Sequence, residues 1–358
     1  MKRSLTFLSV IMLFLGLSAA DMRYVDALGL TVVNRAQPQD TGFARLGADR
    51  YPELPAQVAE YSGHPTGLAV AFRTDSRTVK ARWHTATPPG GANRTPISYC
   101  GLDMYIMRDS TWVFAGVGQP AFSRSHEATI VAGMDGSMHD CLLYLPLWVA
   151  LDSLSIGVDD NAVIEPLPDP FGHRVVVMGS SITHGASASR PGLTYTARLQ
   201  RATGWEMPNL GYSGLCKLEP FYARIIASTE ADAFVFDGFS NPSAEQIDSR
   251  LKEFVDIIRA AHPYTPLIFL QTEVRESGNF DLKKRAFEQR KREAAARGMQ
   301  SLFDAGYRDI YFIDPGMPLD PGHDDTVDGV HPTDAGFEKI VDHLLPRLRI
   351  ILDRYGIK

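Results

Sequence analysis

The stretch that decides the fold is HRVVVMGSSITHG, residues 173–185. Its β-branched and apolar run at 175–178 predicts a buried strand, which Gly179 and two serines end before a small-residue segment of helical character. At the carboxyl end of a parallel strand, the N–H groups of the following helix can face an anion. We take Ser181 as the candidate nucleophile, although Ser180 and Ser181 are also typical of a simple helix cap.

Strands and helices alternate from this stretch to the C-terminus. The predicted strands are 174–178, 233–237, 267–272 and 309–313, and the predicted helices are 195–202, 244–261, 281–297 and 335–355. Such alternation predicts a parallel sheet covered on both faces, with its ligand site at the carboxyl ends of the strands. We therefore expect an α/β domain over residues 170–358.

Residues 21–169 show a different pattern, in which short strands are separated by turns. The predicted strands are 30–35, 67–74, 78–85, 102–108, 111–116, 127–132, 140–145 and 153–158. Since no convincing helix lies among them, the pattern predicts a β-sandwich domain of jelly-roll type. The segment IEPLPDPFG, residues 164–172, has three prolines and a glycine and is typical of a linker.

The first 20 residues have the features of a secretory signal peptide. Lys2 and Arg3 precede an apolar run at 5–17, which is short for a membrane span, and Ser18-Ala19-Ala20 fits the cleavage rule. We expect the mature chain to begin at Asp21, where no cysteine is present to accept a lipid, and hence to have no membrane anchor. The expected location is the periplasm or the cell exterior.

The composition is that of a globular protein, with 44% apolar and 22% charged residues among 358. A formal net charge of −6 without a basic tract argues against nucleic acid or an anionic membrane as the partner. The three cysteines, Cys100, Cys141 and Cys216, are too few and too scattered for a zinc site or a disulfide scaffold. Both a Cys100–Cys141 disulfide and buried free thiols are open alternatives.

A serine nucleophile needs a base, and the base needs an acceptor that orients it. The segment DGVHP, residues 328–332, places Asp328 three residues before His331 in a loop that a proline closes before a helix. In this arrangement His331 can act as the general base while Asp328 fixes its tautomer. An aspartate and a histidine at this spacing are common on protein surfaces. The segment DGVHP therefore indicates a catalytic site only together with the serine segment at the other end of the domain.

An oxyanion hole is the third requirement, because negative charge develops on the attacked carbonyl oxygen. Two predicted strand ends carry suitable donors: NLGYSG at 209–214 and DGFSN at 237–241. Gly214 offers a backbone N–H without an obstructing side chain, and Asn241 offers a side-chain amide. Together with the N–H of Ser181 they make three donors, although Gly214 could serve only a turn and Asn241 only a buried backbone group.

The four segments GSSIT, NLGYSG, DGFSN and DGVHP resemble, in order and context, the conserved blocks of the SGNH or GDSL hydrolases. The resemblance implies a flavodoxin-like hydrolase domain from about Phe171 onward. It also implies that Ser181 is the nucleophile, that Gly214 and Asn241 complete the oxyanion hole, and that His331 and Asp328 are the base and its orienting partner. There is no G-x-S-x-G element, which disfavours the α/β-hydrolase fold.

Two blocks depart from the family pattern, and one N-terminal motif narrows the resemblance. Ser180 replaces the usual aspartate before the nucleophile, and Phe239 and Pro242 occupy the outer positions of the third block. The sequence GLDMY, residues 101–105, resembles the GxDLY signature of a β-domain that precedes the hydrolase in one subgroup of exported bacterial esterases. The resemblance therefore extends over nearly all of the expected mature chain.

Other polar and aromatic residues have competing interpretations. His184 is expected to point away from Ser181 and to be structural or substrate-facing. Glu273 and Arg275 follow a predicted strand and either line the rim of the site or form a surface ion pair. The aromatic residues Tyr105, Trp112 and Phe114 could stack on a sugar, but core packing is expected for at least two of them.

These observations predict an exported serine esterase that removes acetyl or other small acyl groups from a carbohydrate. Its expected partner is an acylated glycan or a small ester, and the expected mechanism needs no metal or organic cofactor. A lipase or long-chain acyl esterase is the first alternative. A glycan-binding protein whose hydrolase domain has lost activity is the second, and the complete set Ser181, His331 and Asp328 argues against it.

Overall fold

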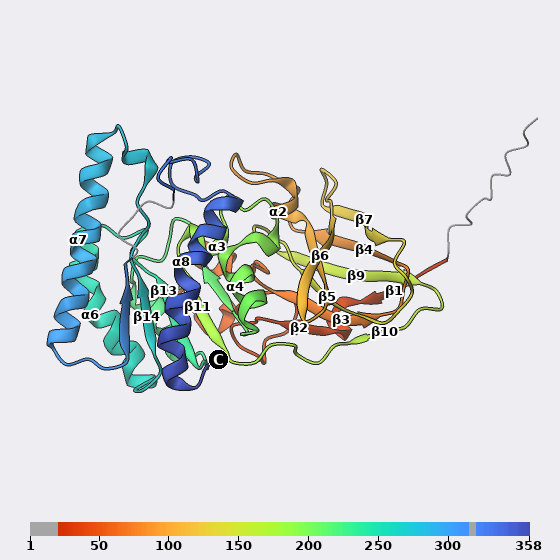
Figure 1. The fold of residues 1–358 in the computed structure, drawn as a ribbon, viewed down its shortest axis with the longest axis horizontal. Coiled ribbons are helices and arrows are strands. Elements are labelled where there is room, and N and C mark those ends of the chain that lie inside the picture. Colours follow the sequence, from red (N-terminus) through yellow and green to blue (C-terminus); the bar gives the residue numbers. More distant parts are fainter. Residues whose placement is uncertain (1–20, 315–319) are drawn as a thin grey trace, which may run out of the picture.

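The computed structural model describes residues 21–314 and 320–358, so the predicted signal peptide lies outside the described residues. The first half of the chain forms a sandwich of two antiparallel sheets, on the right of Figure 1. One sheet has the order β1 (Met22–Asp26), β9 (Leu151–Asp159), β4 (Thr78–Thr85), β7 (Ser125–Ala132). The other has the order β10 (Ile164–Pro166), β3 (Ala69–Thr74), β8 (His139–Tyr144), β5 (Leu102–Arg108), β6 (Thr111–Gly118), and β2 (Thr31–Val33) also pairs with β3.

The sandwich core follows from the two-residue alternation along its strands. In β4 the residues Val79, Ala81 and Trp83 are buried while their neighbours are not, because successive side chains of a strand point to opposite faces. They pack against Val70 and other apolar residues of the second sheet, and the indole N–H of Trp83 donates to the carbonyl of Cys100 at 2.7 Å. The predicted β-sandwich is thus confirmed.

The expectation that no helix lies among these strands is wrong. The structure has α1 (Ala56–Ser62) and α2 (Pro96–Cys100) in this region, and β10 lies within the predicted linker. Helix α2 begins where Thr95 caps the N–H of Ser98, with proline at the first helical position. Both helices are too short to show a clear apolar period. Strand β10 was missed because of its proline, which an edge strand tolerates.

The second half of the chain is a parallel sheet between helices. Its strand order is β12 (Asn209–Gly211), β11 (Val175–Gly179), β13 (Ala233–Asp237), β14 (Leu267–Leu270), β15 (Ile310–Ile313), the flavodoxin-like order 2-1-3-4-5. The α-helices are α3 (Ser181–His184), α4 (Tyr195–Thr203), α5 (Pro220–Ala227), α6 (Ala244–Ala261), α7 (Leu282–Asp304) and α8 (Asp334–Leu352). The short elements β12 and α5 were not predicted, whereas the fold class was.

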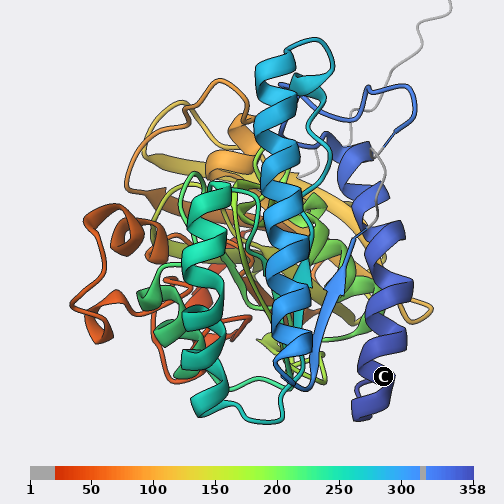
Figure 2. The same ribbon diagram turned by 90° about the vertical axis from the view of Figure 1, so that its left-hand side faces the viewer.

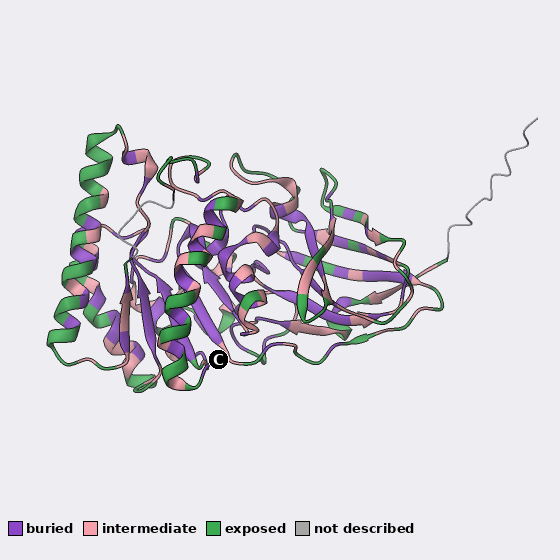
Figure 3. Cartoon of the chain, in the orientation of Figure 1, coloured by how far each residue is buried: buried purple, intermediate pink, exposed green. Residues whose placement is uncertain are grey.

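The sheet is buried on both faces, which explains the unbroken apolar run of β11. Val176 and Met178 pack with α5, α6 and α7, whereas Val175 and Val177 pack with α4 and α8. Figure 2 shows α6 and α8 on opposite sides of the domain, and Figure 3 shows buried residues along the strands between them. In the described ranges no helix is long and apolar enough to cross a membrane.

An ion pair joins the two halves at the predicted GxDLY signature. Asp103, which is fully buried, accepts hydrogen bonds from Arg190 Nη1 at 2.6 Å and from the N–H of Gly192 at 2.8 Å. The hydroxyl of Tyr105 lies 2.8 Å from the same Arg190 nitrogen. The motif of the sandwich therefore holds the segment that leads into α4.

The cysteines are buried free thiols. Cys100 and Cys141 do not pair with each other, and Cys216 is also unpaired. Burial raises the pKa of Cys100 to about 11, so its thiol is protonated at neutral pH.

Candidate active site

The ends of three neighbouring strands meet the loop before α8. Strand β11 ends at Gly179 and continues into Ser180 and Ser181, β12 leads to Gly214, and β13 leads to Asn241. Since all strands of the sheet are parallel, these ends lie at one edge of it. The loop 326–332, pinned by an antiparallel bridge between its first and last residues, brings His331 to the same edge.

The two adjacent serines have different partners. Ser180 is the N-cap of α3: its Oγ accepts a hydrogen bond from the N–H of Ile182 at 3.1 Å and donates to Asp237. Ser181 is the first residue of the helix, and its Oγ lies 2.9 Å from His331 Nε2. The cap and the candidate nucleophile are thus separate residues.

His331 is held between Ser181 and Asp328. Its Nδ1 lies 2.7 Å from Asp328 Oδ2, and the other carboxylate oxygen accepts the backbone N–H groups of Val330 and His331 at 3.1 and 2.9 Å. Burial alone would raise the pKa of Asp328, but the hydrogen bonds from His331 outweigh it and hold that pKa below its usual value. Because an ionised carboxylate can only accept hydrogen bonds, Nδ1 of His331 must carry the proton that faces Asp328, and Nε2 is left to accept a hydrogen bond from the Ser181 hydroxyl.

Asn93, which the sequence analysis missed, reaches this pair from the sandwich. Its Nδ2 lies 3.2 Å from Asp328 Oδ2 and 3.4 Å from His331 Nδ1. It belongs to the loop before α2, whose Pro-Pro-Gly-Gly sequence indicated only a turn. No local pattern could have predicted a contact across more than 230 residues.

The three predicted oxyanion donors lie on the strand-end segments. Among the described residues neither the N–H of Ser181 nor that of Gly214 has an acceptor. Gly214 has a φ of 71°, a conformation that favours glycine. Asn241 donates from Nδ2 to the carbonyl of Leu215, so one amide hydrogen ties the two segments together and the other is left for a ligand.

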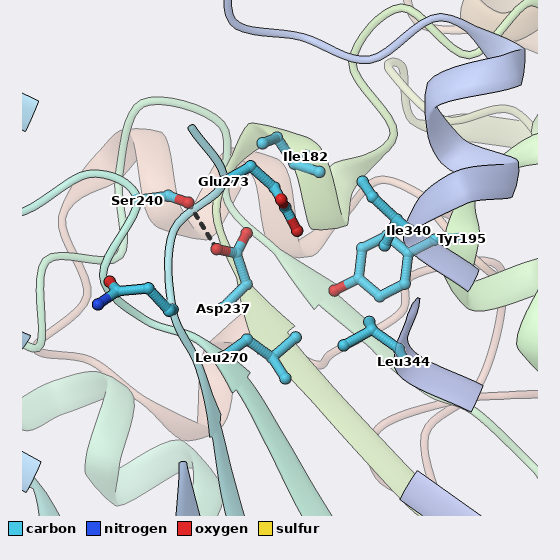
Figure 4. Close-up of a pocket in the computed structure, with 9 residues that line it drawn as sticks. Ile182, Tyr195, Asp237, Ser240, Leu270, Glu273, Ile340 and Leu344 are labelled. Atoms are coloured by element: carbon cyan, nitrogen blue, oxygen red, sulfur yellow. Dashed lines mark hydrogen bonds between the residues drawn. The ribbon is translucent and has the colours of Figure 1, made fainter. Parts of the chain in front are cut away.

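Asp237 links the first and third segments, a role that the sequence did not reveal. Its Oδ2 accepts hydrogen bonds from the Ser180 and Thr183 hydroxyls, and its Oδ1 accepts one from Ser240 at 2.6 Å (Figure 4). It is 7% exposed and lies at the end of β13. Gly179 leaves room for it, because a Cβ there would lie 2.7 Å from the Cβ of Asp237.

Arg275 connects the His331 loop to the Asn241 loop. Its Nη1 donates to the carbonyl of Val330 at 3.2 Å and its Nη2 to the carbonyl of Ser240 at 3.4 Å. Lys291 donates to the same Ser240 oxygen at 2.8 Å. Arg275 is 8% exposed, so the alternative of a surface ion pair is wrong for it.

Glu273 faces a small cavity beneath these segments. The cavity, about 20 Å³, is lined by Asp237, Tyr195, Ile182 and apolar residues of β14 and α8, and the carboxyl groups of Glu273 and Asp237 face it (Figure 4). Glu273 Oε2 has no hydrogen-bond partner in the described part of the chain. Burial and the nearby charge of Asp237 raise the pKa of Glu273 to about 7.

His184 and the sandwich aromatics are largely structural. The fully buried His184 places Nε2 2.8 Å from the carbonyl of Leu147, and within the described residues its side chain makes no hydrogen bond to Ser181. Tyr105 is buried and Trp112 packs against the same core, as expected for two of the three aromatics. Phe114 is 47% exposed, with Arg190 4.0 Å over its ring.

Comparisons with protein families match both halves of the chain. The family described as GDSL-like lipase/acylhydrolase matches residues 172–349. The family described as the N-terminus of SGNH-hydrolase-type esterases matches residues 22–164. A sequence search among curated proteins gave no match.

Several solved structures are similar to the chain. A protein described as a GDSL-like lipase from Bacteroides ovatus has 40% identity and a TM-score of 0.91, with 93% of this chain and 98% of that chain covered. The salicylyl-acyltransferase SsfX3 of a tetracycline biosynthetic pathway has 21% identity and a TM-score of 0.73, with 94% and 98% covered. An acetyl xylan esterase from the rumen bacterium Butyrivibrio proteoclasticus has 12% identity and a TM-score of 0.58, with 93% and 99% covered.

Proposed function

Because the chain belongs to the GDSL-like lipase/acylhydrolase family, we propose that it is an exported serine esterase that removes acetyl or other small acyl groups from a carbohydrate. The observation that carries the proposal is the hydrogen-bonded series Ser181, His331 and Asp328, with distances of 2.9 and 2.7 Å. This geometry suits nucleophilic attack by a hydroxyl that a histidine deprotonates.

In the first step, Ser181 Oγ attacks the ester carbonyl while His331 Nε2 takes its proton. The imidazolium that forms is stabilised by Asp328 through Nδ1, and Asn93 adds a donor to the same carboxylate. Because Asp328 also accepts two backbone N–H groups, the carboxylate is fixed before reaction begins.

The attack produces a tetrahedral oxyanion, which the N–H groups of Ser181 and Gly214 and the amide of Asn241 stabilise. His331 then protonates the departing sugar oxygen, and the acyl group is left on Ser181. Water attacks this acyl-enzyme while His331 takes its proton, and His331 then returns that proton to Ser181 Oγ as the bond to the acyl group breaks and the acid is released. Each proton transfer in the cycle passes through His331 Nε2.

A carbohydrate is proposed as the alcohol because of the structural neighbours. The acetyl xylan esterase of B. proteoclasticus and a family two carbohydrate esterase of Clostridium thermocellum share the fold, the latter at 12% identity and a TM-score of 0.60, with 80% of this chain and 93% of that chain covered. The sandwich lies beside the proposed site and reaches it through Asn93, so it can shape the binding of a large substrate. Export is proposed from the features of residues 1–20.

The mechanism is tested with the Ser181→Ala variant on an aryl acetate. Loss of the nucleophile is expected to lower kcat by about 10⁴-fold or more. The exposed Ser249→Ala variant on α6 is the matched control and should retain wild-type turnover. Wild-type turnover by Ser181→Ala would overturn the mechanism.

The substrate is tested by acetate release from a panel of acetylated glycans and by aryl esters of increasing acyl length. The proposal expects acetate release from at least one glycan and the highest kcat/KM with the shortest acyl chains. A maximum with long chains would overturn the carbohydrate assignment in favour of a lipase. Glycan binding without turnover of any ester would instead indicate a binding protein.

A further inference from the structure

Arg94 is a partly buried cation beside the proposed site that no group of the protein neutralises. Among the described residues, it is the one arginine that is not exposed and makes no hydrogen bond or ion pair. Other buried or half-buried arginines have polar partners, such as Asp103 for Arg190 and Glu206 for Arg174. An uncompensated charge in such a position is costly, so its presence requires an explanation.

The groups around Arg94 are aromatic. Its guanidinium lies 3.6 Å over the ring of Trp148 and 6.0 Å from the centre of the Tyr99 ring. Burial lowers the pKa of Arg94, and only the phenols of Tyr61 and Tyr99 oppose this effect, with no carboxylate among the causes. Stacking on an aromatic face leaves the N–H groups at the edge of a guanidinium free to bind a ligand.

Arg94 is connected to the proposed site on two sides. Its neighbour Asn93 bonds to Asp328 and lies beside His331. The ring of Trp148 stacks on His184, with centroids 3.9 Å apart and planes 6° apart, and His184 is in the short helix that Ser181 begins. The guanidinium is therefore flanked by Asn93, which contacts the loop of the base, and by Trp148, which packs on the helix that the nucleophile begins.

The loop that carries Arg94 is shaped to fold this side chain back. Gly91 has a φ of 92°, and a Cβ there would lie 3.0 Å from Arg94 Cδ. A non-glycine residue at position 91 would be strained in its backbone and would press on the arginine stem. The position of the guanidinium thus depends on the backbone as well as on Trp148.

We propose that Arg94 binds a carboxylate on the substrate, so that the preferred substrate is an acylated acidic sugar such as a uronic acid. The proposal rests on the proposed esterase function and specifies its substrate class. A guanidinium binds a carboxylate through two parallel hydrogen bonds, and a single cation balances a single negative charge. Within the described part of the chain, Arg45 is the other arginine whose charge acts on His184, and it does not add a second positive charge at this point, because it is fully buried and donates to the carbonyl of Asn209.

The experiment compares two acetylated sugars that differ only in the carboxylate, a methyl galacturonoside and a methyl galactoside acetylated at the same hydroxyl. Wild-type kcat/KM should be higher for the acid. In Arg94→Met, which keeps an apolar stem over Trp148, kcat/KM for the acid should fall by about 10- to 100-fold, far more than for the neutral sugar. Arg94→Lys should recover part of the preference.

The matched control is Arg82→Met. Arg82 also lies over an aromatic ring, 3.9 Å from that of Tyr24, but it is exposed and pairs with Glu127 in the sandwich. This variant should leave both substrates at wild-type rates. Raising the ionic strength from about 0.1 M to about 1 M should reduce the wild-type preference for the acid and leave that of Arg94→Met unchanged.

Failure of the carbohydrate assignment is distinguished from failure of the carboxylate site by a second pair, 4-acetoxybenzoate and its methyl ester. If the sugars are not hydrolysed but the charged aryl ester is preferred in an Arg94-dependent way, the carbohydrate assignment fails and the carboxylate site stands. If wild-type enzyme shows no preference for the charged member of either pair, or if Arg94→Met loses equally on both members, the carboxylate site is overturned.

Discussion

Ser180 and Ser181 show how neighbouring identical side chains acquire different functions. The Ser180 hydroxyl accepts a hydrogen bond from the N–H of Ile182 and donates one to the carboxylate of Asp237. The Ser181 hydroxyl lies instead against His331. The usual aspartate of the family motif is replaced by Ser180, yet the capping contact is retained because a hydroxyl can accept one hydrogen bond and donate another.

The Ser180→Ala variant is predicted to lose stability more than chemistry. It removes the cap of α3 and one donor to Asp237, which should cost about 1–2 kcal/mol in the free energy of unfolding. Urea denaturation measures this loss. Because Ser181 and His331 keep their contact, kcat on an aryl acetate should fall far less than in Ser181→Ala, and an equal fall would contradict the separation of roles.

Glu273 predicts a pH-dependent stability. Its pKa in the folded protein, about 7, is above the ordinary value of about 4.3 for the unfolded chain, so folding favours the protonated form. The contribution of Glu273 to the free energy of unfolding is fully present below pH ~4.3 and is lost as the pH rises through 7. The complete loss is on the order of 3 kcal/mol.

The Glu273→Gln variant tests this dependence by melting temperature at two pH values. It should be more stable than the wild type at pH ~8, where wild-type Glu273 must ionise, and close to the wild type at pH ~5. The exposed Glu253→Gln variant of α6 is the control and should show no such difference. If Glu273→Gln changed the melting temperature equally at both pH values, the raised pKa of Glu273 would be wrong.

At the level of single residues, the sequence identified the groups that lie in short motifs but not their supports. Ser181, His331 and Asp328 were predicted because serine, histidine and aspartate have a known chemistry in those contexts, and the structure brings them into hydrogen-bond contact. Asn93 and Asp237 were missed because their roles arise only from tertiary contacts.

Among the elements, the loops after β13 and before α8 depend on a common support. Arg275 follows β14 and donates to carbonyls in both loops, one residue before Asn241 and one before His331. A side chain that bonds to two carbonyls fixes the distance between the loops. Its position therefore bears on catalysis even though it touches neither proposed catalytic group.

The Arg275→Met variant is predicted to lower kcat on an aryl acetate by about tenfold or more, with a smaller change in KM, because misplaced groups affect the transition state most. The exposed Arg290→Met variant of α7 is the control. If KM rose while kcat stayed at the wild-type value, Arg275 would act in substrate binding and the positioning role would be wrong.

The elements themselves were predicted best where they are long or fully buried. The predicted ranges 78–85, 102–108, 233–237 and 244–261 coincide with β4, β5, β13 and α6. The missed strands and α-helices, β1, β10, β12, α1, α2 and α5, have between three and eight residues, too few for a period to be recognised. Their formation depends on caps and on the core that they join.

For the whole molecule, the buried pair Asp103–Arg190 is the main polar connection at the GxDLY signature. Asp103 is fully buried, so removing its charge leaves the partly buried Arg190 without a counter-charge. Asp103→Asn is therefore predicted to lower the free energy of unfolding by about 3 kcal/mol, measured by urea denaturation. Glu127→Gln, which breaks the exposed pair with Arg82, should change stability little, and a comparable loss there would contradict the argument.

The contact between Asn93 and the Asp328–His331 pair has a consequence for how the protein is made. A ribosome releases residue 93 long before residue 331, and the proposed site is complete only when both have been placed. A nascent chain that stops before His331 would contain the serine but no base, and so would not hydrolyse esters during synthesis. The appearance of hydrolysis would then report, in real time, that the last loop has docked onto the first domain.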